Sequence, residues 1–334
     1  MGEKMYCILL ATYNGEKYVQ ELLDSIEAQT VTDWELIAFD DRSTDKTYEI
    51  LREFQKKHRK QVIVERNVTS TGNAKDNFAL LFRRAKKSNA QYFLPADQDD
   101  VWLPDKIEKL SNAMNKMEER FGERTPVLIH SDLIVADSKL NVISESFFEY
   151  AKLEKKTPIY KLVSQNNVTG CACMINRELL MSVADEIGLE TVMMHDYWCA
   201  LYAAVFGRIA FLNTPTVYYR QHGNNSLGAQ KANSLVRLYK RFSNGRRDYI
   251  RDVKATRMQA KTFAECYESR VNEVYKYPGT AHERSYKYMR VSMELLSKFG
   301  DLDRKTKVQK LKFYYEYKVW KKGAARVLAQ ILWS

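Results

Sequence analysis

Short apolar runs alternate with amphipathic stretches through residues 1–215. A short apolar run is typical of a strand that is buried on both faces. Four such strands are predicted, at 6–12, 36–39, 62–64 and 91–94. The stretches between them carry apolar residues at the spacing of one helix face. They predict helices over 16–29, from a cap at Ser43 or Thr44 through Phe54, and over 73–87. Regular alternation of strand and helix predicts βαβ units, so the fold class is α/β.

The pattern changes after residue 125, where the strand and helix signals become less regular. Further strands are predicted at 127–129, 171–175, 209–211 and 216–219, with a hairpin or meander over 133–142. Helices are predicted over 177–186 and 195–206. We expect the late strands to join antiparallel and make the sheet mixed. After Gly228 helical patterns dominate, so we place an α/β domain at 1–230 and a mainly helical extension at 231–334.

Charge is divided unequally between these two parts of the chain. The formal net charge is +11, and residues 231–334 hold 25 Lys and Arg against 10 Asp and Glu. Residues 1–230 hold 28 basic and 32 acidic side chains, so all the excess positive charge lies in the extension. Such asymmetry points to nucleic acid, an anionic membrane surface or another acidic partner for the extension.

Targeting signals and metal-type cysteine motifs do not stand out in the chain. No apolar run approaches the roughly 20 residues that span a bilayer, and the N-terminus lacks the apolar stretch of a signal peptide. We therefore expect a cytoplasmic protein. The five cysteines have no CxxC spacing, which predicts buried, reduced thiols and neither disulfides nor zinc.

Polar residues follow the predicted strands at four places, where ligands of a parallel sheet bind. They are Thr12–Asn14, Asp40–Ser43, Asp97–Asp100 and His195–Asp196. Asp40–Ser43 also reads as a turn with a helix cap, and Asp97–Asp100 as an acidic loop capping a helix. Three carboxylates within four residues repel one another unless a cation joins them. Oxygen ligands select Mg²⁺ or Mn²⁺, commonly shared with nucleotide phosphates, and no Walker or GxGxxG motif is present.

Six segments give residues 5–225 a resemblance to a known family. They are Ala11–Gly15, Asp40–Asp45, Asp97–Trp102, Asn167–Gly170, His195–Trp198 and Tyr219–Asn225. In this order they resemble the family 2 inverting glycosyltransferases. The forms of Asp97–Trp102, His195–Trp198 and Arg220–His222 look most like the bacterial rhamnosyltransferase-type subgroup of surface polysaccharide synthesis. The resemblance implies the GT-A fold, a Rossmann-like mixed central sheet flanked by helices, here followed by the C-terminal helical extension.

The resemblance also implies a donor site for a nucleotide-diphospho-sugar, with dTDP-rhamnose or a UDP-sugar as the main candidates. Thr12 and Tyr13, with Glu16 as a further candidate, would frame the nucleobase, and Asp40 or Asp41 would hydrogen-bond its edge. Asp97 would face the ribose or the metal, and Asp99 would ligate Mg²⁺ or Mn²⁺. His222 would complete the metal shell or touch the diphosphate, unless it is a surface histidine. Asp100 is expected to cap the next helix, and Lys75 to be a helix-surface lysine rather than a phosphate ligand.

An inverting transfer needs one general base and no covalent intermediate. The resemblance assigns the base to Asp196, supported by His195, with a helix N-cap as the alternative for Asp196. A sugar nucleotidyltransferase is a rival function, but Ala11–Gly15 lacks the Gly-rich basic loop expected of one. A catalytically inactive polysaccharide-assembly scaffold is a second rival, and the intact Asp97, Asp99 and Asp196 argue against it.

The end of the chain combines positive charge with aromatic residues. Between Lys305 and Arg326 there are eight basic side chains and one acidic, interleaved with Phe313, Tyr314, Tyr315, Tyr317 and Trp320. This pattern suits a membrane interface, packing on the α/β domain or an oligomer contact, and no nucleic-acid-binding signature accompanies it. We favour the membrane, and therefore expect a lipid-linked glycan acceptor and peripheral association with the inner face of the cell membrane.

Overall fold

The strand β1 (Tyr6–Thr12) lies inside the sheet and packs on both faces. Cys7 and Leu9 contribute to the apolar core on one face, and Ile8 and Leu10 to the core on the other. This two-sided burial explains why the run is continuously apolar. The protein is described here by a computed structural model covering residues 5–222, 245–275, 280–322 and 324–333. The expected boundary near residue 230 lies outside the described residues.

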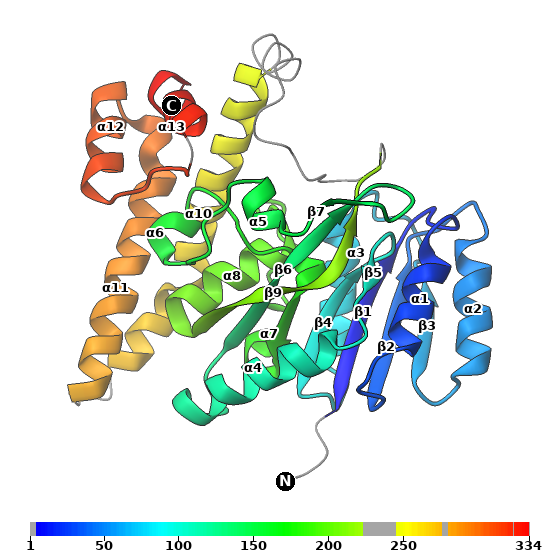
Figure 1. Cartoon of the computed structure of the whole chain (residues 1–334). Coiled ribbons are helices and arrows are strands. Elements are labelled where there is room, and N and C mark those ends of the chain that lie inside the picture. The colour runs from blue at the N-terminus through cyan, green and yellow to red at the C-terminus, as the bar shows by residue number, and fades with distance from the viewer. Residues whose placement is uncertain (1–4, 223–244, 276–279, 323, 334) are drawn as a thin grey trace.

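The described residues form one nine-stranded mixed sheet, as expected (Figure 1). Three strands run parallel with β1 in the order β3-β2-β1-β4, namely β2 (Trp34–Asp40), β3 (Val62–Arg66) and β4 (Tyr92–Asp97). β8 (Cys173–Asn176) joins β4 to β6 (Val127–Ala136), antiparallel to both. The sheet ends with β9 (Arg208–Arg220), parallel to β6, and β5 (Val101–Trp102). The short β7 (Val142–Ser144) pairs with β6, so the predicted hairpin over 133–142 is present.

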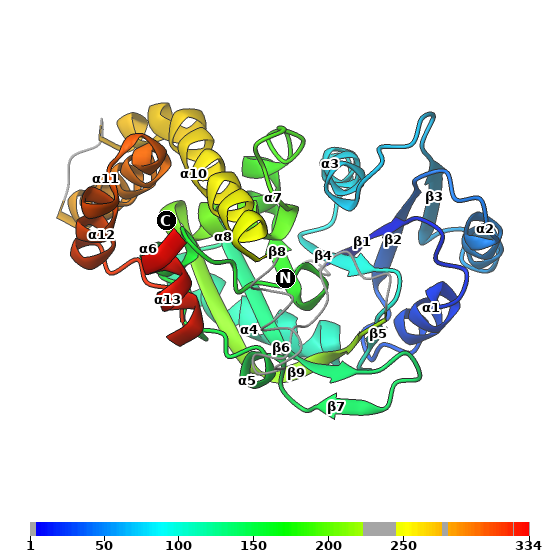
Figure 2. The ribbon, with the colours of Figure 1, turned by 90° about the horizontal axis from the view of Figure 1, so that it is seen from above.

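Helices cover both faces of the sheet (Figure 2). One face carries α1 (Val19–Glu27), α2 (Thr47–Lys57) and α4 (Lys106–Phe121). The other carries α3 (Ala74–Ala85), α7 (Arg177–Val183) and α8 (His195–Phe206). The bounds of α8 match the prediction because ten of its twelve side chains are buried and its apolar run is continuous.

Two predictions about the later strands were wrong. The runs 209–211 and 216–219 belong to one strand, β9, because the strand continues through Pro215 with an irregular register against β6. Cys171 lies in a short 3₁₀ helix (Gly170–Ala172) ahead of β8, so Cys171 and Cys173 contribute to opposite cores. All five cysteines are free thiols, and Cys266 is exposed rather than buried.

The C-terminal helices pack on the α/β part through a shared apolar core. They are α10 (Gly245–Tyr275), α11 (Thr280–Gly300), α12 (Lys307–Glu316) and α13 (Ala324–Trp333), with a 3₁₀ turn at Asp301–Arg304. On α10, Phe263 and Tyr267 contact Trp198 of α8, with ring centroids 5.0 and 6.0 Å away. Among the described residues, no helix is long and apolar enough to cross a bilayer.

Most of the aromatic face near the end of the chain packs inside the protein. Phe313 and Tyr314 are buried in the same core as α8 and α10, and the Tyr314 hydroxyl accepts a hydrogen bond from Arg257 of α10 at 2.7 Å. Tyr317 and Trp320 pack partly against this core, whereas Tyr315 is 81% exposed. Packing on the protein, the alternative to membrane contact, therefore accounts for most of these rings.

The shared core predicts that α10 stabilises the whole fold. Phe263→Ala should lower the free energy of unfolding by about 3–5 kcal/mol, because it leaves a cavity between α10 and α8. Met258→Ala, at an exposed position of the same helix, should change it by less than about 0.5 kcal/mol. Denaturant unfolding monitored by fluorescence and circular dichroism tests this. Two separate transitions, only one of which moves in Phe263→Ala, would contradict a shared core.

Candidate active site

The acidic loop, defined here as Asp97–Asp100, begins where β4 ends and is fastened to the end of β1. The Gln98 amide pairs with the backbone of Tyr13, accepting from its N–H and donating to its carbonyl, both at 2.9 Å. The Gln98 amide lies so close to Gly15 that a Cβ there would be 2.3 Å from Gln98 Oε1. Glycine at position 15 is therefore needed for the contact that joins the ends of β1 and β4.

Arg220, at the end of β9, is one of two buried basic residues beside the acidic loop in the described part of the chain. Its side chain is 1% exposed, and its Nε donates to the carbonyl of Asp99 at 2.8 Å. Its backbone N–H donates to Asp100 Oδ1 at 3.1 Å, and its Nη2 pairs with Glu21 of α1 at 2.7 Å. Arg220 thereby ties β9 and α1 to the loop. The motif Tyr219–Asn225 contains Arg220, yet the sequence did not reveal its role.

A second buried cation, Lys106, lies at the start of α4. Its side chain is fully buried, and its ammonium donates to the carbonyl of Cys171 and lies 3.4 Å from the centroid of the Trp102 ring. Burial lowers the pKa of Lys106 to about 7, while nearby Cys171, Asp100 and Asp97 act in the opposite direction. Arg220 and Lys106 thus approach the loop from two different elements, and the Lys106 ammonium is only partly charged at neutral pH. A lone lysine in a helical pattern gave no signal of this in the sequence.

The residues at the acidic loop fit a divalent cation. Asp99 Oδ2 lies 2.8 Å from His222 Nε2, close to the separation of about 3 Å between adjacent ligand atoms of an octahedral Mg²⁺. Asp97, Asp100 and Cys171 offer ligand atoms within 4.8 Å of one another. Asp100 Oδ2 is buried and has no hydrogen-bond partner among the described residues. The carboxylates therefore offer the oxygen ligands that a hard cation uses, and the roles of Asp99 and His222 as its ligands stay predictions.

Cys171 was not expected in this cluster, and Asp100 was expected to cap the next helix. Burial raises the pKa of the Cys171 thiol well above its usual range, and nearby Asp100 and Asp97 add to the shift, so the thiol keeps its proton. A protonated thiol is a poor ligand for Mg²⁺ or Mn²⁺. Asp100 does not cap α4, since its Oδ1 accepts from Arg220 and the helix begins only at Lys106. Burial, with the charges of Asp99 and Asp196, raises the pKa of Asp97 to about 7.

The two aspartates after β2 hold the backbone at the ends of β2 and β3. Asp40 is fully buried, accepts from the N–H and hydroxyl of Ser43, and pairs with Arg66 at 3.3 Å. Asp41 accepts hydrogen bonds from the segment 67–72, among them the Thr71 N–H at 2.6 Å. Burial alone would raise the pKa of Asp41, but these hydrogen bonds lower it below its usual value. Both carboxylates therefore order the loops at this end of the sheet.

The other expected donor-side residues lie together at the ends of β1 and β2. Thr12 is buried, and its hydroxyl donates to Asp40 Oδ1 at 3.4 Å. Glu16 accepts from the Lys46 N–H at 2.9 Å, so it joins the two loops. The Tyr13 ring is 54% exposed and is available to a nucleobase. Lys75 instead donates to the Leu189 carbonyl at 3.1 Å, as a helix-surface lysine does.

Asp196 lies in the first turn of α8 and is held by donors from one segment of the chain. Gly170 N–H donates to Asp196 Oδ2 at 3.0 Å, and the Asn166 amide donates to Oδ1 at 3.2 Å. The N-cap position belongs to Met194, so the N-cap alternative for Asp196 does not hold. Burial raises the pKa of Asp196 to about 7, which is the range of an effective general base.

His195 packs beneath this turn in an apolar setting. Its ring lies 3.8 Å from that of Phe78 and 5.7 Å from that of Phe82, between centroids. Neither ring nitrogen has a hydrogen-bond partner among the described residues, and burial lowers the pKa of His195 to about 3. A Cβ on Gly170 would lie 2.6 Å from His195 Nε2. The neutral His195 ring therefore contacts the Gly170 backbone, whose N–H holds Asp196.

Comparison with known proteins decides the family. A family model described as "Glycosyl transferase family 2" matches residues 7–183, more than half of the chain. The chain belongs to glycosyl transferase family 2. It is therefore a glycosyltransferase, as expected.

Relatives agree with this family. The chain is 28% identical over 256 residues to the dTDP-rhamnosyl transferase RfbG of Shigella flexneri, covering 72% of this chain and 81% of the relative. It is 30% identical over 102 residues to the putative teichuronic acid biosynthesis glycosyltransferase TuaG of Bacillus subtilis, covering 30% and 38%. The structure of S. aureus TarS residues 1–349 with UDP has a TM-score of 0.52 at 15% identity, covering 98% of this family 2 chain and 89% of TarS. That likeness supports the GT-A fold.

Proposed function

We propose that this glycosyltransferase moves a sugar, with L-rhamnose the main candidate, from a nucleotide-diphospho-sugar to a lipid-linked glycan, with inversion and with a divalent cation. One observation carries the proposal. The acidic loop, whose carboxylates suit a cation, and a separate buried carboxylate, Asp196, lie near each other, since the charge of Asp196 contributes to the raised pKa of Asp97. An inverting transfer needs these two centres, one for the leaving diphosphate and one for the acceptor hydroxyl.

The donor is inferred from both the site and the relatives. The exposed Tyr13 ring and the loop ordered by Asp41 frame a place for the base beyond β1 and β2. Asp97 faces the ribose or the cation, and Asp99 with His222 would hold the cation. RfbG is named for a dTDP-rhamnosyl donor, and TarS was solved with UDP and with UDP-GlcNAc. A dTDP- or UDP-sugar is therefore the donor that we assign.

The reaction follows from the positions of the two carboxylate centres. Asp196 accepts the proton of the acceptor hydroxyl, whose oxygen forms a bond to the anomeric carbon as the bond from that carbon to the diphosphate oxygen breaks. Attack opposite the leaving group inverts the configuration. Mg²⁺ or Mn²⁺, when bound, supplies positive charge to the leaving diphosphate. Asn166 and Gly170 orient Asp196 through its two oxygens, and Arg220 keeps the acidic loop in place.

The base assignment predicts a specific kinetic defect. Asp196→Asn should lower kcat by about 10² to 10⁴-fold, because the acceptor hydroxyl then loses its general base. Binding of the nucleotide diphosphate, measured by calorimetry, should be unchanged. The matched control is Asp185→Asn, whose exposed carboxylate pairs with Lys86 at the surface. Turnover of Asp196→Asn equal to that of the control would place the base elsewhere.

The acidic loop predicts metal-dependent donor binding. EDTA should abolish transfer and Mn²⁺ or Mg²⁺ should restore it, because the carboxylates and the diphosphate repel one another without a cation. Asp99→Asn should weaken Mn²⁺ binding in the presence of nucleotide diphosphate by about tenfold or more, as measured by electron paramagnetic resonance. Asp105→Asn, on the surface at the start of α4, should bind Mn²⁺ like the wild type. Full activity in a demonstrably metal-free sample would contradict the prediction.

The proposal of a lipid-linked acceptor is based on the surface of α12 and α13. Four large apolar side chains are exposed there, namely Val308, Tyr315, Leu328 and Leu332. Lys305, Lys307 and Lys312 are exposed along α12 and the approach to it. Exposed apolar residues with cations beside them are typical of a surface that lies on anionic lipid. We therefore assign peripheral attachment to the inner face of the cell membrane to this surface, which the exposed Tyr315 rather than the buried rings would help to anchor.

This surface predicts salt-sensitive binding to anionic vesicles. Changing Lys305, Lys307 and Lys312 to Gln should weaken binding to phosphatidylglycerol vesicles by about tenfold or more at low salt, since each cation near such a surface contributes about 1 kcal/mol. The control changes the exposed Arg59, Lys60 and Lys87 to Gln, with the same loss of charge elsewhere. Equal vesicle binding by the two variants in a sedimentation assay would rule out this surface.

A further inference from the structure

The Asp196 carboxylate is held by a loop that has little regular secondary structure. Two of the hydrogen bonds to this carboxylate come from Asn166 and Gly170, at the end of the segment 151–170. Within this segment α6 (Ile159–Leu162) is a single turn. The Asn167 amide donates to the Glu154 carbonyl and, at 3.3 Å, to that of Lys156, so it folds the segment back on itself. The position of Asn166 therefore depends on what packs against residues 151–167, called here the base loop.

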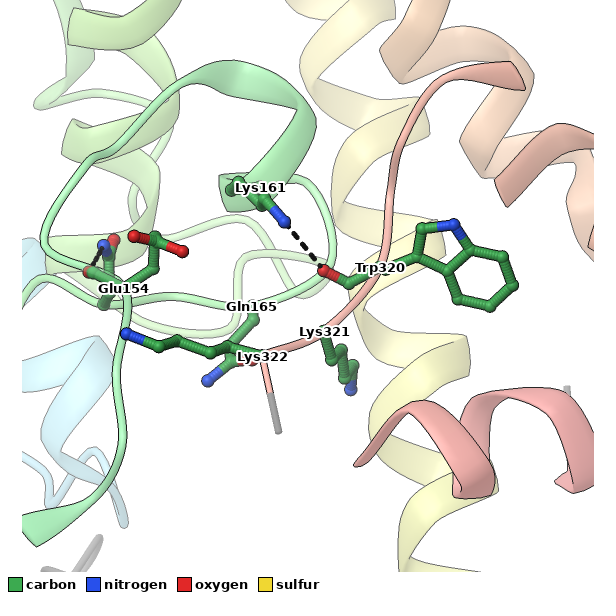
Figure 3. Close-up of a pocket in the computed structure, with 7 residues that line it drawn as sticks. Glu154, Lys161, Gln165, Trp320, Lys321 and Lys322 are labelled. Carbon is green, nitrogen blue, oxygen red and sulfur yellow. Dashed lines mark hydrogen bonds between the residues drawn. The ribbon is translucent and has the colours of Figure 1, made fainter. Parts of the chain in front are cut away.

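The C-terminal part of the chain packs against the base loop (Figure 3). Lys161 of the loop donates to the Trp320 carbonyl at 3.4 Å, drawn as a dashed line between two ribbons far apart in sequence. From the C-terminal part of the chain, Lys322 donates to the Leu153 carbonyl of the loop at 2.8 Å. Arg326 donates through Nη2 to the Ala151 carbonyl at 3.1 Å. Residues 318–322 with Arg326, called here the clamp segment, thus hold the loop at its start and at α6.

The clamp segment is itself firmly anchored. Val319 is fully buried in the core that includes α8 and α10. Gln330 of α13 is 2% exposed, donates to the Val319 carbonyl at 2.7 Å and accepts from the Lys321 N–H at 3.1 Å. Buried side chains of α13 and the core therefore fix the clamp segment, whose lysine side chain and backbone carbonyl bind the base loop.

We propose that the clamp segment positions the catalytic base of this glycosyltransferase. The proposal rests on the proposed role of Asp196 as the base. It follows a continuous set of contacts from Gln330 through the clamp segment and the base loop to Asn166 and Asp196. Lys322 and Arg326 act here as positioning residues, because they touch backbone carbonyls of the base loop. The C-terminal helices accordingly contribute to turnover even when the acceptor is soluble and no membrane is present.

A double substitution tests the clamp segment. Lys322→Met with Arg326→Met removes the two sets of donors while keeping long side chains. With a short soluble acceptor, kcat should fall about tenfold, since small displacements of a reacting group cost up to about 10²-fold. The affinity for nucleotide diphosphate and the melting temperature should remain those of the wild type. The control, Arg284→Met with Lys287→Met, removes the same two charges from exposed positions of α11 and should keep wild-type kcat.

Two further measurements separate positioning from other causes. In an Asp196→Asn background the clamp substitutions should cause no further loss of kcat, because their effect passes through Asp196. Asn166→Ala, which acts at the other end of the same set of contacts, should lower kcat similarly and should not add to the clamp substitutions. If the clamp variant is unstable, Asn166→Ala provides the test instead. A wild-type kcat for Asn166→Ala would overturn the proposal. So would a loss of kcat by Asn166→Ala that is as large in the Asp196→Asn background as in the wild type.

Hydrogen exchange tests the clamp segment without relying on turnover. Amides of 151–170 should exchange faster in the clamp variant than in the wild type or in the α11 control, while those of the acidic loop stay unchanged. Unchanged exchange over 151–170 would overturn the clamp proposal whether or not the protein transfers sugar. Conversely, a wild type that transfers no sugar from any nucleotide-sugar, together with faster exchange in the variant, would contradict the proposed function and leave the clamp contact supported.

Discussion

Three carboxylates held within four residues constrain the arrangement of the whole site. Asp97, Asp99 and Asp100 would repel one another in the interior unless positive groups faced them. Arg220, at the end of β9, donates through its backbone N–H to the Asp100 carboxylate and through its side chain to the Asp99 carbonyl. Against the larger effect of burial, nearby Lys106, at the start of α4, lowers the pKa of Asp97. Both cations are almost fully buried. The ends of β4 and β9 must therefore stay together, and the mixed half of the sheet is joined to the parallel half at the point where the donor would bind.

This arrangement assigns separate tasks to the two sides of the site. On the β1–β4 side, polar side chains such as Gln98, Asp40 and Asp41 are used mainly to order loops, and Asp99 with His222 remains the pair suited to a cation. On the α8 side, burial raises the pKa of Asp196 to about 7, so that its carboxylate can take up a proton near neutral pH. Two carboxylate centres in such different surroundings can hold a diphosphate and accept a proton in one reaction.

Much of this architecture is predictable from local sequence. The strands β1 to β4 and helix α8 are continuous apolar runs or clear helical patterns, and their polar ends contain most of the candidate site. Roles that depend on contacts distant in sequence are not predictable in this way. Arg220 and Lys106 have ordinary local patterns, and only the fold brings them to the acidic loop. The clamp contact of Lys322 with Leu153 joins residues 169 positions apart.

The C-terminal extension shows the same limit in its aromatic residues. Their spacing among lysines favours a membrane surface, yet Phe313 and Tyr314 are buried against α10 and α11. Local periodicity identifies which side chains share a helix face, but not whether that face meets lipid or the rest of the chain. Irregular pairing has a similar effect in β9, where Asn213, Thr214 and Pro215 resemble a turn in sequence and lie inside one strand.

The most direct test of the account is a crystal structure with a nucleoside diphosphate and Mn²⁺, with the metal located by its anomalous scattering. The account predicts one strong peak about 2.2 Å from both an Asp99 carboxylate oxygen and His222 Nε2, in contact with the diphosphate, and Arg220 still bonded to the Asp99 carbonyl. A peak beside Asp100 and Cys171 instead, or a bound diphosphate with no metal peak, would contradict it.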